Sequence, residues 1–409
     1  MRLVSARVVV PMVPGGPAWL AEGAVALDDD DAVRAVGPRA ELRRRFAEAP
    51  EQRADGALLP GLVNAHTHLE LAALAGEVPG GDGLVAWAGA CMHAGEELTH
   101  EQRRDAAARA AAEAVRFGTA AVGDVGNSLA SLSAIAAAGL RGTIFHELLG
   151  SRDARTGDAL ADAARERAVA SKAHPWPRGL GYVLAPHAPY SADHGLLRRI
   201  FSAAARTGLP TSIHVAEDPD ELALLRDGSG RWPAVLAAMG VDVKTRVPRK
   251  SPLAYLATLG AFASPAPPLL VHMVHATPED RRLAHETGAT AVLCPRSNLH
   301  IGGRLADVPA LLADGVLLAL GTDSLASSPD VSLFGEIATL RAAFPAIPAL
   351  RWLEAATTGG AEALRLDSCG SLAPARKPGL IDVDVDDLGA PLEALVRTPA
   401  PTVRWMAHA

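Results

Sequence analysis

The chain of 409 residues alternates short apolar runs with longer, alanine-rich stretches of helical periodicity. Apolar runs of about four to eight residues are typical of buried strands, whereas longer amphipathic stretches are typical of helices. The apolar runs predict eight strands, at 57–65, 119–124, 142–147, 179–185, 211–215, 268–274, 290–294 and 316–322. Helical patterns lie between these strands, for example at 101–116, 195–207, 278–287 and 332–343.

The last of these strands is apolar at every position from 316 to 320, not at every second position. A strand that is apolar on both faces belongs in a parallel sheet that helices cover on both sides. Eight such strands alternating with helices indicate an α/β protein. We therefore predict a (β/α)8 barrel of the TIM type over residues 57–369.

Both ends of the chain have a different, short β pattern. Apolar or β-branched runs occur at 2–10 and 24–27, and a similar run returns at 380–385. The two termini of a domain often lie close together at the surface. We therefore predict a small β-sandwich domain that is built from residues 1–56 and 370–409.

Composition excludes several classes of protein. Apolar residues make up 49% of the chain and charged residues 21%, and the net charge is -7. This is a globular composition without the basic excess of nucleic-acid-binding proteins. Three cysteines cannot form a disulfide framework, so we expect a cytoplasmic protein. We expect no membrane span, because no apolar stretch reaches about 20 residues.

Residues that often bind metals follow several of the predicted strands. In a barrel of this type, reactive groups gather at the carboxyl ends of the strands. His66 and His68 follow the first strand, and their spacing of two places both side chains on one face. His214 ends the fifth strand, His272 lies in the sixth, and Asp323 ends the eighth. These side chains should therefore meet.

Imidazoles combined with one carboxylate suit Zn2+ or Fe2+. A structural zinc site would instead be rich in cysteine, and the three cysteines here are scattered. We expect one divalent metal, with zinc favoured and iron as the alternative. Such a site keeps a position for water and lowers the pKa of that water, which creates hydroxide near neutral pH.

Five segments in a fixed order carry a family resemblance. They read Pro-Gly-Leu-Val-Asn-Ala-His-Thr-His-Leu-Glu at 60–70, His-Val-Ala-Glu at 214–217, Val-His-Met-Val-His at 271–275, Cys-Pro-Arg-Ser-Asn at 294–298 and Leu-Gly-Thr-Asp-Ser at 320–324. With them the chain resembles the amidohydrolase superfamily, in its cytosine-deaminase and chlorohydrolase-like branch. The resemblance extends over nearly the whole chain. The tail segment at 377–383 departs from the usual family pattern in the place of its aspartate.

The resemblance assigns a role to each of these residues. It implies that the metal ligands are His66, His68, His214 and Asp323. Glu217 would be the proton shuttle, since one carboxylate can act first as a base and then as an acid. His272 would orient or polarise the attacking hydroxide, and Asp323 would take a proton from the metal-bound water. Binuclear members use a carboxylated lysine, but Lys172 lies in a helical pattern, so we expect a single metal.

Other residues near the strand ends are candidates for substrate binding: His187, Glu70, Trp87 and Arg296. Trp87 lies in a long predicted loop at 77–96 and could instead serve packing. Arg296 could hold an anionic group of the substrate or a neighbouring carboxylate. Ser297 and Asn298 could support the metal ligands through hydrogen bonds. The role of His275 stays open. A proline- and glycine-rich segment at 227–267 is longer than most loops and predicts a lid.

The resemblance implies a hydrolase that deaminates an amino-substituted nitrogen heterocycle by attack of metal-bound hydroxide and releases ammonia. The segments 251–260 and 321–334 look most like aminodeoxyfutalosine-deaminase-type members, so the substrate could be the adenine of aminodeoxyfutalosine or of a related nucleoside. The expected partners are this small molecule and a second copy of the chain in a homodimer. The alternatives are a cyclic-amide hydrolase, a triazine chlorohydrolase using the same site, or a non-catalytic scaffold.

Overall fold

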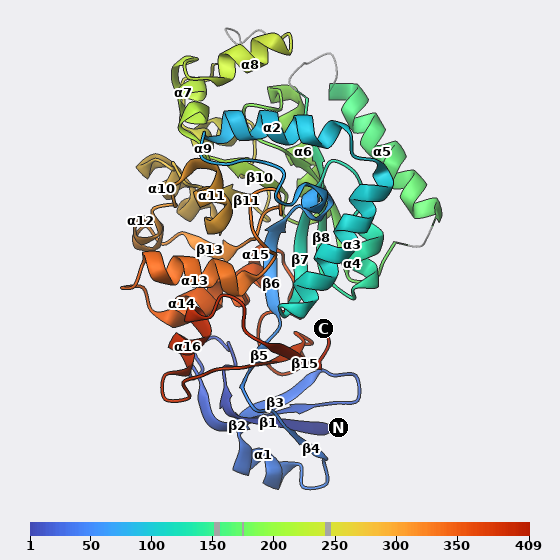
Figure 1. Cartoon of the computed structure of the whole chain (residues 1–409), viewed down its shortest axis with the longest axis vertical. Coiled ribbons are helices and arrows are strands. Elements are labelled where there is room, and N and C mark those ends of the chain that lie inside the picture. The colour runs from blue at the N-terminus through green and yellow to red at the C-terminus, as the bar shows by residue number, and fades with distance from the viewer. Residues whose placement is uncertain (151–155, 174–175, 242–246) are drawn as a thin grey trace.

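A sheet formed by both ends of the chain lies at one end of the molecule, and parallel strands and helices make up the rest (Figure 1). The computed structural model describes residues 1–150, 156–173, 176–241 and 247–409. The predicted α/β class is confirmed by these elements.

The terminal sheet joins strands that are more than 300 residues apart in the sequence. Its order is β15-β14-β5-β1-β2-β3, and β4 pairs with β1. The described strands thus pair in one sheet, and the predicted β sandwich is not confirmed. Asp382 accepts a hydrogen bond of 2.9 Å from the backbone N–H of Gly56, which ties the tail to the N-terminal part. The strands are β1 (Arg2–Val9), β2 (Leu20–Leu27), β3 (Val33–Pro38), β4 (Glu51–Arg53), β5 (Ala57–Pro60), β14 (Leu380–Val383) and β15 (Val403–Ala407).

The predicted strand at 57–65 is in fact two strands. β5 pairs in the terminal sheet, whereas β6 begins at Leu62 and pairs with β7. Gly61 separates them, and a Cβ atom there would lie 2.6 Å from the side chain of Ala120. Only glycine fits this close approach. The apolar pattern does not reveal the break, because both strands are buried and only one residue lies between them.

The eight remaining strands form two parallel sheets of four, in the orders β6-β7-β8-β9 and β10-β11-β12-β13. Hydrogen bonds also link the edges of the two sheets. His66 accepts one of 3.0 Å from Thr322 N–H, and His187 accepts one of 3.0 Å from His214 N–H. The strands are β6 (Leu62–Thr67), β7 (Thr119–Gly126), β8 (Arg141–Leu148), β9 (Leu180–Pro186), β10 (Ser212–Val215), β11 (Leu269–His272), β12 (Thr290–Leu293) and β13 (Leu317–Leu320).

The helices begin where the sequence supplies caps. Thr99 and Thr277 each form a capping box at the start of a predicted helix, and glycine in the left-handed conformation follows the helices that end at Thr207 and Thr287. The helices are α1 (Arg39–Arg45), η1 (Leu69–Leu74), α2 (Leu84–Glu96), α3 (His100–Arg116), α4 (Leu132–Ala137), α5 (Thr156–Ala173), α6 (His194–Thr207), α7 (Pro219–Asp227), α8 (Trp232–Ala238), α9 (Pro252–Thr258), α10 (Pro278–Thr287), α11 (Pro295–Gly302), α12 (Val308–Ala313), α13 (Leu333–Ala343), α14 (Ala349–Ala355), α15 (Thr358–Ala363) and α16 (Pro391–Arg397).

Two predicted irregular segments contain helices. The segment at 77–96 was expected to be a loop, but most of it is α2. Gly89 and Gly95 lower its helix propensity, so packing against neighbouring elements stabilises this helix more than its sequence does. The predicted lid at 227–267 contains α8 and α9, and its residues 242–246 lie outside the described residues. Position 172 lies in α5 and not in a strand, as expected.

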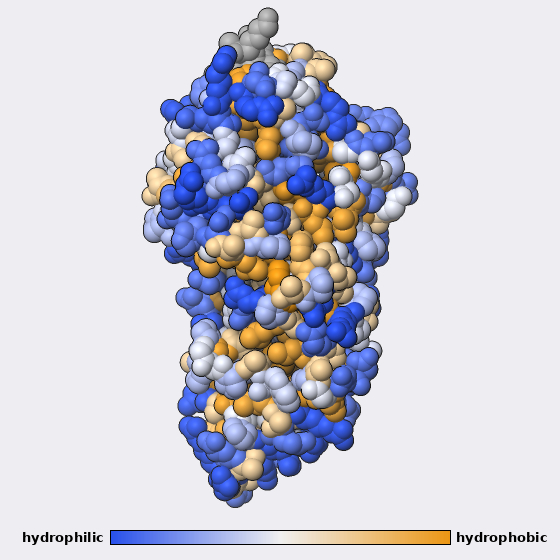
Figure 2. Space-filling view, turned by 90° about the vertical axis from the view of Figure 1, so that its left-hand side faces the viewer, coloured by the Kyte–Doolittle hydropathy of each residue, from blue (hydrophilic) through white to orange (hydrophobic). Residues whose placement is uncertain are grey.

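The face of the molecule in Figure 2 is neither uniformly polar nor uniformly apolar. On the side that Figure 2 presents, apolar side chains gather in patches along the middle of the molecule, and hydrophilic side chains border them. Among the helices that the structure describes, none is both long and apolar enough to cross a bilayer.

Candidate active site

Four side chains from three strand ends meet in one buried cluster. His66 and His68 come from the end of β6, His214 from β10, and Asp323 from the turn after β13. Nitrogens of the three histidines lie within 4.8 Å of one another. Asp323 Oδ1 lies 3.9 Å from His66 Nε2 and 3.7 Å from His68 Nε2. The structure therefore brings together the four residues that the sequence suggested as metal ligands.

The backbone takes unusual conformations where these strands end. His272, Asp323 and Ala216 have φ angles of +78°, +57° and +52°, in the left-handed region that residues other than glycine rarely adopt. Such conformations cost on the order of 1 kcal/mol each and are typical of functional sites. The side chains they present are thus held in place by surrounding hydrogen bonds, for example that from Asp323 N–H to His66 O at 3.2 Å.

The histidines of the cluster are held neutral. Burial is the main cause that lowers the pKa of His66 and His68 well below the usual range. The Nδ1 atom of His214 lies 2.9 Å from the carbonyl oxygen of His187, which can only accept, so His214 carries its proton on Nδ1 and presents a lone pair on Nε2. That Nε2 lies 3.2 Å from His68 Nε2.

A cation fits this cluster. Both ring nitrogens of His66 are buried and have no hydrogen-bond partner among the described residues. An unsatisfied buried polar atom costs about 1–3 kcal/mol, so these nitrogens are suited to bind a ligand such as a cation. Converging lone pairs of neutral imidazoles beside one carboxylate are a typical donor set for Zn2+.

Glu217 and His272 face each other next to the cluster. Their closest atoms, Oε1 and Nε2, are 3.5 Å apart. Asn298 Nδ2 lies 3.0 Å from His272 Nδ1, and since an amide nitrogen donates, His272 carries its proton on Nε2 and directs it toward Glu217. Burial, and next the nearby Asp323 carboxylate, raise the pKa of Glu217 well above its usual range. Glu217 therefore takes up a proton more readily than an exposed glutamate does, as a proton shuttle requires.

The second predicted supporting residue, Ser297, binds the carboxylate of the cluster. Its hydroxyl donates a hydrogen bond of 2.6 Å to Asp323 Oδ2. Ser327, which the sequence analysis did not single out, lies 2.8 Å from the same hydroxyl. Asn298 and Ser297 thus each contact a residue of the site, as expected for outer groups that orient metal ligands.

Glu221 is a residue of this site that the sequence analysis missed. Its buried carboxylate accepts hydrogen bonds from the N–H groups of Ala216 and Glu217, at 3.0 and 3.1 Å. The sequence signals only a helix start at this point, with Asp218 as N-cap and proline at the first position. That signal does not show that the Glu221 side chain turns back toward the end of β10.

Three residues of the cluster, His68, His214 and Asp323, line a cavity of about 910 Å3. Trp87, one of the predicted substrate-binding residues, lines it from α2, and Trp232 lines it from α8. The indole N–H groups of both tryptophans are buried without a hydrogen-bond partner in the described part of the chain. Tyr190 stacks on Trp232 with ring centroids 4.2 Å apart. The cavity thus has aromatic side chains in its wall.

His187 also lines this cavity, beside a pair of polar residues. Its Nδ1 atom lies 2.6 Å from the hydroxyl of Ser191. Glu147, at the end of β8, accepts a hydrogen bond of 2.9 Å from Asn127 Nδ2, and burial raises its pKa to about 8. Both Glu147 and Asn127 line the cavity, so a ligand here meets polar as well as aromatic groups.

Glu70, which was predicted to bind substrate, and His275, whose role was left open, are not among the residues that line the cavity. Glu70 accepts hydrogen bonds from Asn127 N–H at 2.7 Å and from the Ser128 hydroxyl at 2.6 Å, and it is not among the lining residues. Its buried carboxylate supports the turn that carries Asn127. His275 lies outside the lining set too, and its backbone N–H donates to Ala216 O at 2.7 Å.

Arg296 is the other residue that the structure does not bring to the cavity. Its guanidinium contacts Glu336 Oε1 at 2.6 Å and Asp330 Oδ1 at 2.9 Å. Glu336 is fully buried, and burial raises its pKa to about 7 despite the guanidinium. Of the two alternatives from the sequence, the structure places Arg296 against neighbouring carboxylates.

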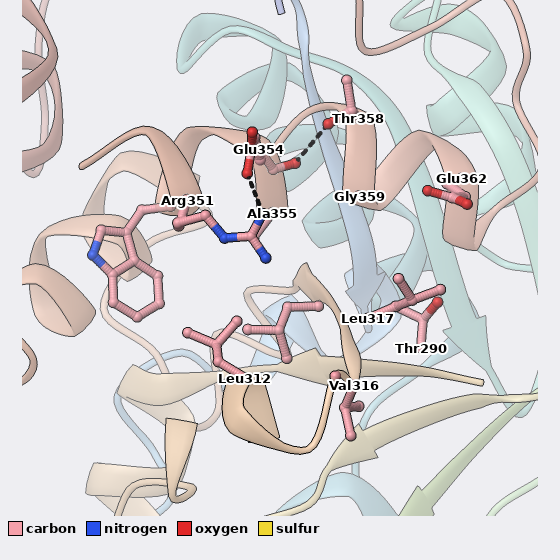
Figure 3. A pocket seen from close by; sticks show the side chains of 13 residues that line it. Thr290, Leu312, Val316, Leu317, Arg351, Glu354, Ala355, Thr358, Gly359 and Glu362 are labelled. Atoms are coloured by element: carbon pink, nitrogen blue, oxygen red, sulfur yellow. Dashed lines mark hydrogen bonds and ion pairs between the residues drawn. The ribbon is translucent and has the colours of Figure 1, made fainter. Parts of the chain in front are cut away.

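A second, smaller pocket of about 240 Å3 lies at the opposite end of the strands (Figure 3). It is lined by the beginnings of β12 and β13, with Thr290 and Leu317, and by α14 and α15. Its arginine, Arg351, pairs with Glu354 at 2.7 Å, as the dashed line in Figure 3 marks. The residues that line it include no histidine, so the catalytic candidates belong to the larger cavity.

Comparison with known proteins agrees with this site. The model of the amidohydrolase family matches residues 57–403. Aminodeoxyfutalosine deaminase of Deinococcus radiodurans is 36% identical over 346 residues, which cover 81% of this chain and 78% of that protein. A zinc-bound adenosine deaminase from Xanthomonas campestris superimposes with a TM-score of 0.79 at 28% identity, covering 98% of this chain and 91% of that chain.

The structure of Helicobacter pylori aminofutalosine deaminase in complex with methylthio-coformycin has the same fold, with a TM-score of 0.83 at 20% identity and coverage of 100% of this chain and 98% of that chain. The predicted family is thus confirmed by a sequence match over most of the chain and by the fold. The chain belongs to the amidohydrolase family.

Proposed function

We propose that this protein is a metal-dependent deaminase that removes the amino group from an adenine-type ring, with water as co-substrate and ammonia as product. One observation carries the proposal: the Glu217 carboxylate lines the same cavity as His68, His214 and Asp323 of the cluster and lies 3.5 Å from His272. Deamination needs a group that protonates the ring next to the point of attack. The similarity to named nucleoside deaminases supports the same chemistry.

His66, His68, His214 and Asp323 would hold a single divalent cation, and zinc fits the donor set best. Fe2+ would bind the same nitrogen and oxygen ligands, so metal analysis has to decide between the two. The bound cation would supply hydroxide at neutral pH by lowering the pKa of water.

The protein side chains would move the protons. Asp323 Oδ would take the proton from the attacking water. Glu217 Oε would give its proton to the ring nitrogen beside the attacked carbon, then take the proton of the newly added hydroxyl group and deliver it to the departing amino group. The proton held by Asp323 would return to Glu217 at the end of the cycle. His272, held by Asn298, would direct its Nε2–H toward the attacking oxygen and stabilise its charge. The carbon–nitrogen bond breaks, a carbon–oxygen bond replaces it, and one water is consumed for each ammonia released.

The cavity supports a substrate larger than a free base. Ligand pockets span roughly 300–1,000 Å3, and the volume here lies near the upper end of that range. An adenine nucleoside such as aminodeoxyfutalosine would place its ring at the cluster and its remaining part toward Trp87 and His187.

The arrangement of the two parallel sheets is also part of the proposal. We propose that the two parallel sheets close into one eight-stranded barrel, since hydrogen bonds join them at both edges. The small domain would comprise the terminal sheet. A homodimer in the cytoplasm stays a prediction from the family resemblance.

The decisive experiment measures ammonia release by the metal-loaded protein from a panel of amino-substituted rings, with metal content determined on the same sample. The panel contains aminodeoxyfutalosine, adenosine, thioether adenosines, guanine, cytosine and aminotriazines. Release from an adenine nucleoside supports the proposal. No release from any compound, with about one metal bound per chain, would contradict it and favour hydrolysis of a cyclic amide or a chlorotriazine by the same site.

A further inference from the structure

Helix α2 lies along the cavity, and the surroundings at its two ends differ in polarity. At its beginning, Leu84 N–H donates a hydrogen bond of 3.2 Å to Asp218 at the start of α7. Near its end, Gly95 O accepts one of 2.6 Å from Arg103 Nη2 of α3. A helix of 13 residues is about 20 Å long, and Figure 1 shows α2 stretching between α7 and α5.

The first end of the cavity is apolar. Its walls come from the beginning of α2 and from α8, with the lining residues Leu84, Val85, Trp87, Trp232, Val235 and Leu236. The other end is polar, where Arg103 lines the cavity together with Gly95 and Glu96. A substrate that reaches this second end therefore meets a charged group there.

Arg103 is the single lysine or arginine among the described residues that line the cavity. It is half-buried and has no ion pair with any described residue. Two acidic residues that line the cavity have other neighbours, since Asp162 pairs with Arg165 and Glu96 lies 3.8 Å from His93. No described carboxylate thus forms an ion pair with Arg103, although its charge acts over a longer distance on the buried Glu70 carboxylate, which is hydrogen-bonded to Asn127 and Ser128.

The guanidinium also retains donors. A guanidinium offers five N–H groups in a planar fork, and one of its nitrogens, Nη2, donates to Gly95 O. That hydrogen bond fixes one side of the guanidinium. Nε and Nη1 have no hydrogen-bond acceptor among the described residues. Arginine forks of this kind bind carboxylate and phosphate groups in a two-point contact.

We propose that Arg103 binds an anionic group, a carboxylate or a phosphate, that the substrate carries on the part remote from its amino-bearing ring. This inference rests on the proposed deaminase function, because it places that ring at the histidine cluster. Arg103 is then a specificity-determining residue: it selects nucleosides with a negatively charged substituent over neutral ones. A purely structural role, in which Arg103 only caps the end of α2, is the competing explanation.

The experiment compares two adenosines that differ only in charge. One carries a carboxyethyl group on its 5′-sulfur, and the other carries the matching carboxamide. Steady-state kcat and KM are measured for both with metal-loaded wild type, Arg103→Met and Arg104→Met. Arg104 is the matched control, because it lies next to Arg103 on α3, is half-exposed, and is near Glu101 and Asp105 outside the cavity. Adenosine 5′-monophosphate against adenosine forms a second arm that tests phosphate.

In wild type we expect a higher kcat/KM for the charged member of one pair, and that pair identifies the anion. Arg103→Met should lower the ratio of charged to neutral kcat/KM by about tenfold or more, mainly through KM, as loss of a charge-assisted hydrogen bond predicts. Arg104→Met should leave that ratio unchanged. Arg103→Lys should restore part of it, since lysine keeps the charge but not the fork.

An equal loss with charged and neutral substrates in Arg103→Met would overturn the inference and indicate the structural role. So would a wild-type enzyme that shows no preference within either pair. Failure of the proposed function looks different, because the wild type would then release ammonia from none of the four compounds despite bound metal.

Discussion

Glu221 Oε1 accepts a hydrogen bond of 3.0 Å from the backbone N–H of Ala216, the residue whose left-handed conformation turns the chain away from β10. The other carboxylate oxygen accepts the N–H of Glu217 at 3.1 Å. One buried side chain thus fixes both residues of the turn. Because Glu217 is the proposed proton shuttle, Glu221 positions a group whose placement decides the rate.

Substitution Glu221→Gln should lower kcat while the protein keeps its metal. An amide offers one acceptor oxygen, and its NH2 group would face the second backbone N–H, so the turn should shift. Displacement of a catalytic group by about 1 Å can cost on the order of 100-fold in rate. Glu279→Gln on the exposed side of α10 is the control. A kcat like that of wild type would show that the turn holds without this carboxylate.

The stability of the protein should depend on pH through Glu221. Burial raises the pKa of Glu221 to about 8, whereas the pKa of an unfolded glutamate is about 4.3. Between these values the folded protein binds the proton more tightly, so this contribution to the free energy of unfolding is full at low pH and falls as pH rises toward 8. As the pH rises toward 8, the Tm of the wild type should therefore fall relative to the Tm of Glu221→Gln. Parallel Tm curves for both proteins would contradict this assignment.

Substitution Glu217→Gln should retain the metal and lose most of the activity. A glutamine cannot transfer protons, and general acid–base groups contribute about 100- to 10,000-fold to the rate. Ammonia release and metal content measured on one sample test both parts of this prediction. Near-normal turnover would exclude Glu217 as the proton shuttle.

The variants His214→Ala and Asp323→Ala should lose metal as well as activity. Each removes one donor from the cluster, whose nitrogens lie within 4.8 Å of one another. Mass-spectrometric metal analysis after dialysis measures the loss, and His285→Ala, at an exposed position of α10, serves as control. If either ligand variant keeps full metal occupancy, the proposed ligand set is incorrect.

Substitution Arg296→Met should destabilise the protein and leave KM nearly unchanged. It removes the guanidinium 2.6 Å from the fully buried Glu336 carboxylate. Breaking one side of a buried ion pair costs about 3–5 kcal/mol. Chemical denaturation measures this loss, and the double variant Arg296→Met with Glu336→Gln should recover part of it. A large rise in KM with unchanged stability would instead support the substrate-binding alternative for Arg296.

Local sequence patterns determined the strands and the candidate ligands of this protein. Buried strands need continuous apolar runs, and caps such as Thr277 mark helix starts. Both features therefore depend on residues that are close together in the sequence. Spacing also placed His66 and His68 on one side of a strand. The order of strands then predicted that His214 and Asp323 would join them, and in the structure they do.

Contacts between distant segments were decided only by the tertiary structure. The break at Gly61 depends on the approach of Ala120, and the placement of Arg296 depends on Glu336, 40 residues away. The helix α2 forms over the cavity although its glycines disfavour helix. In each case the free energy that decides the structure comes from packing or from the pairing of a buried charge. Neither depends on the neighbouring sequence alone.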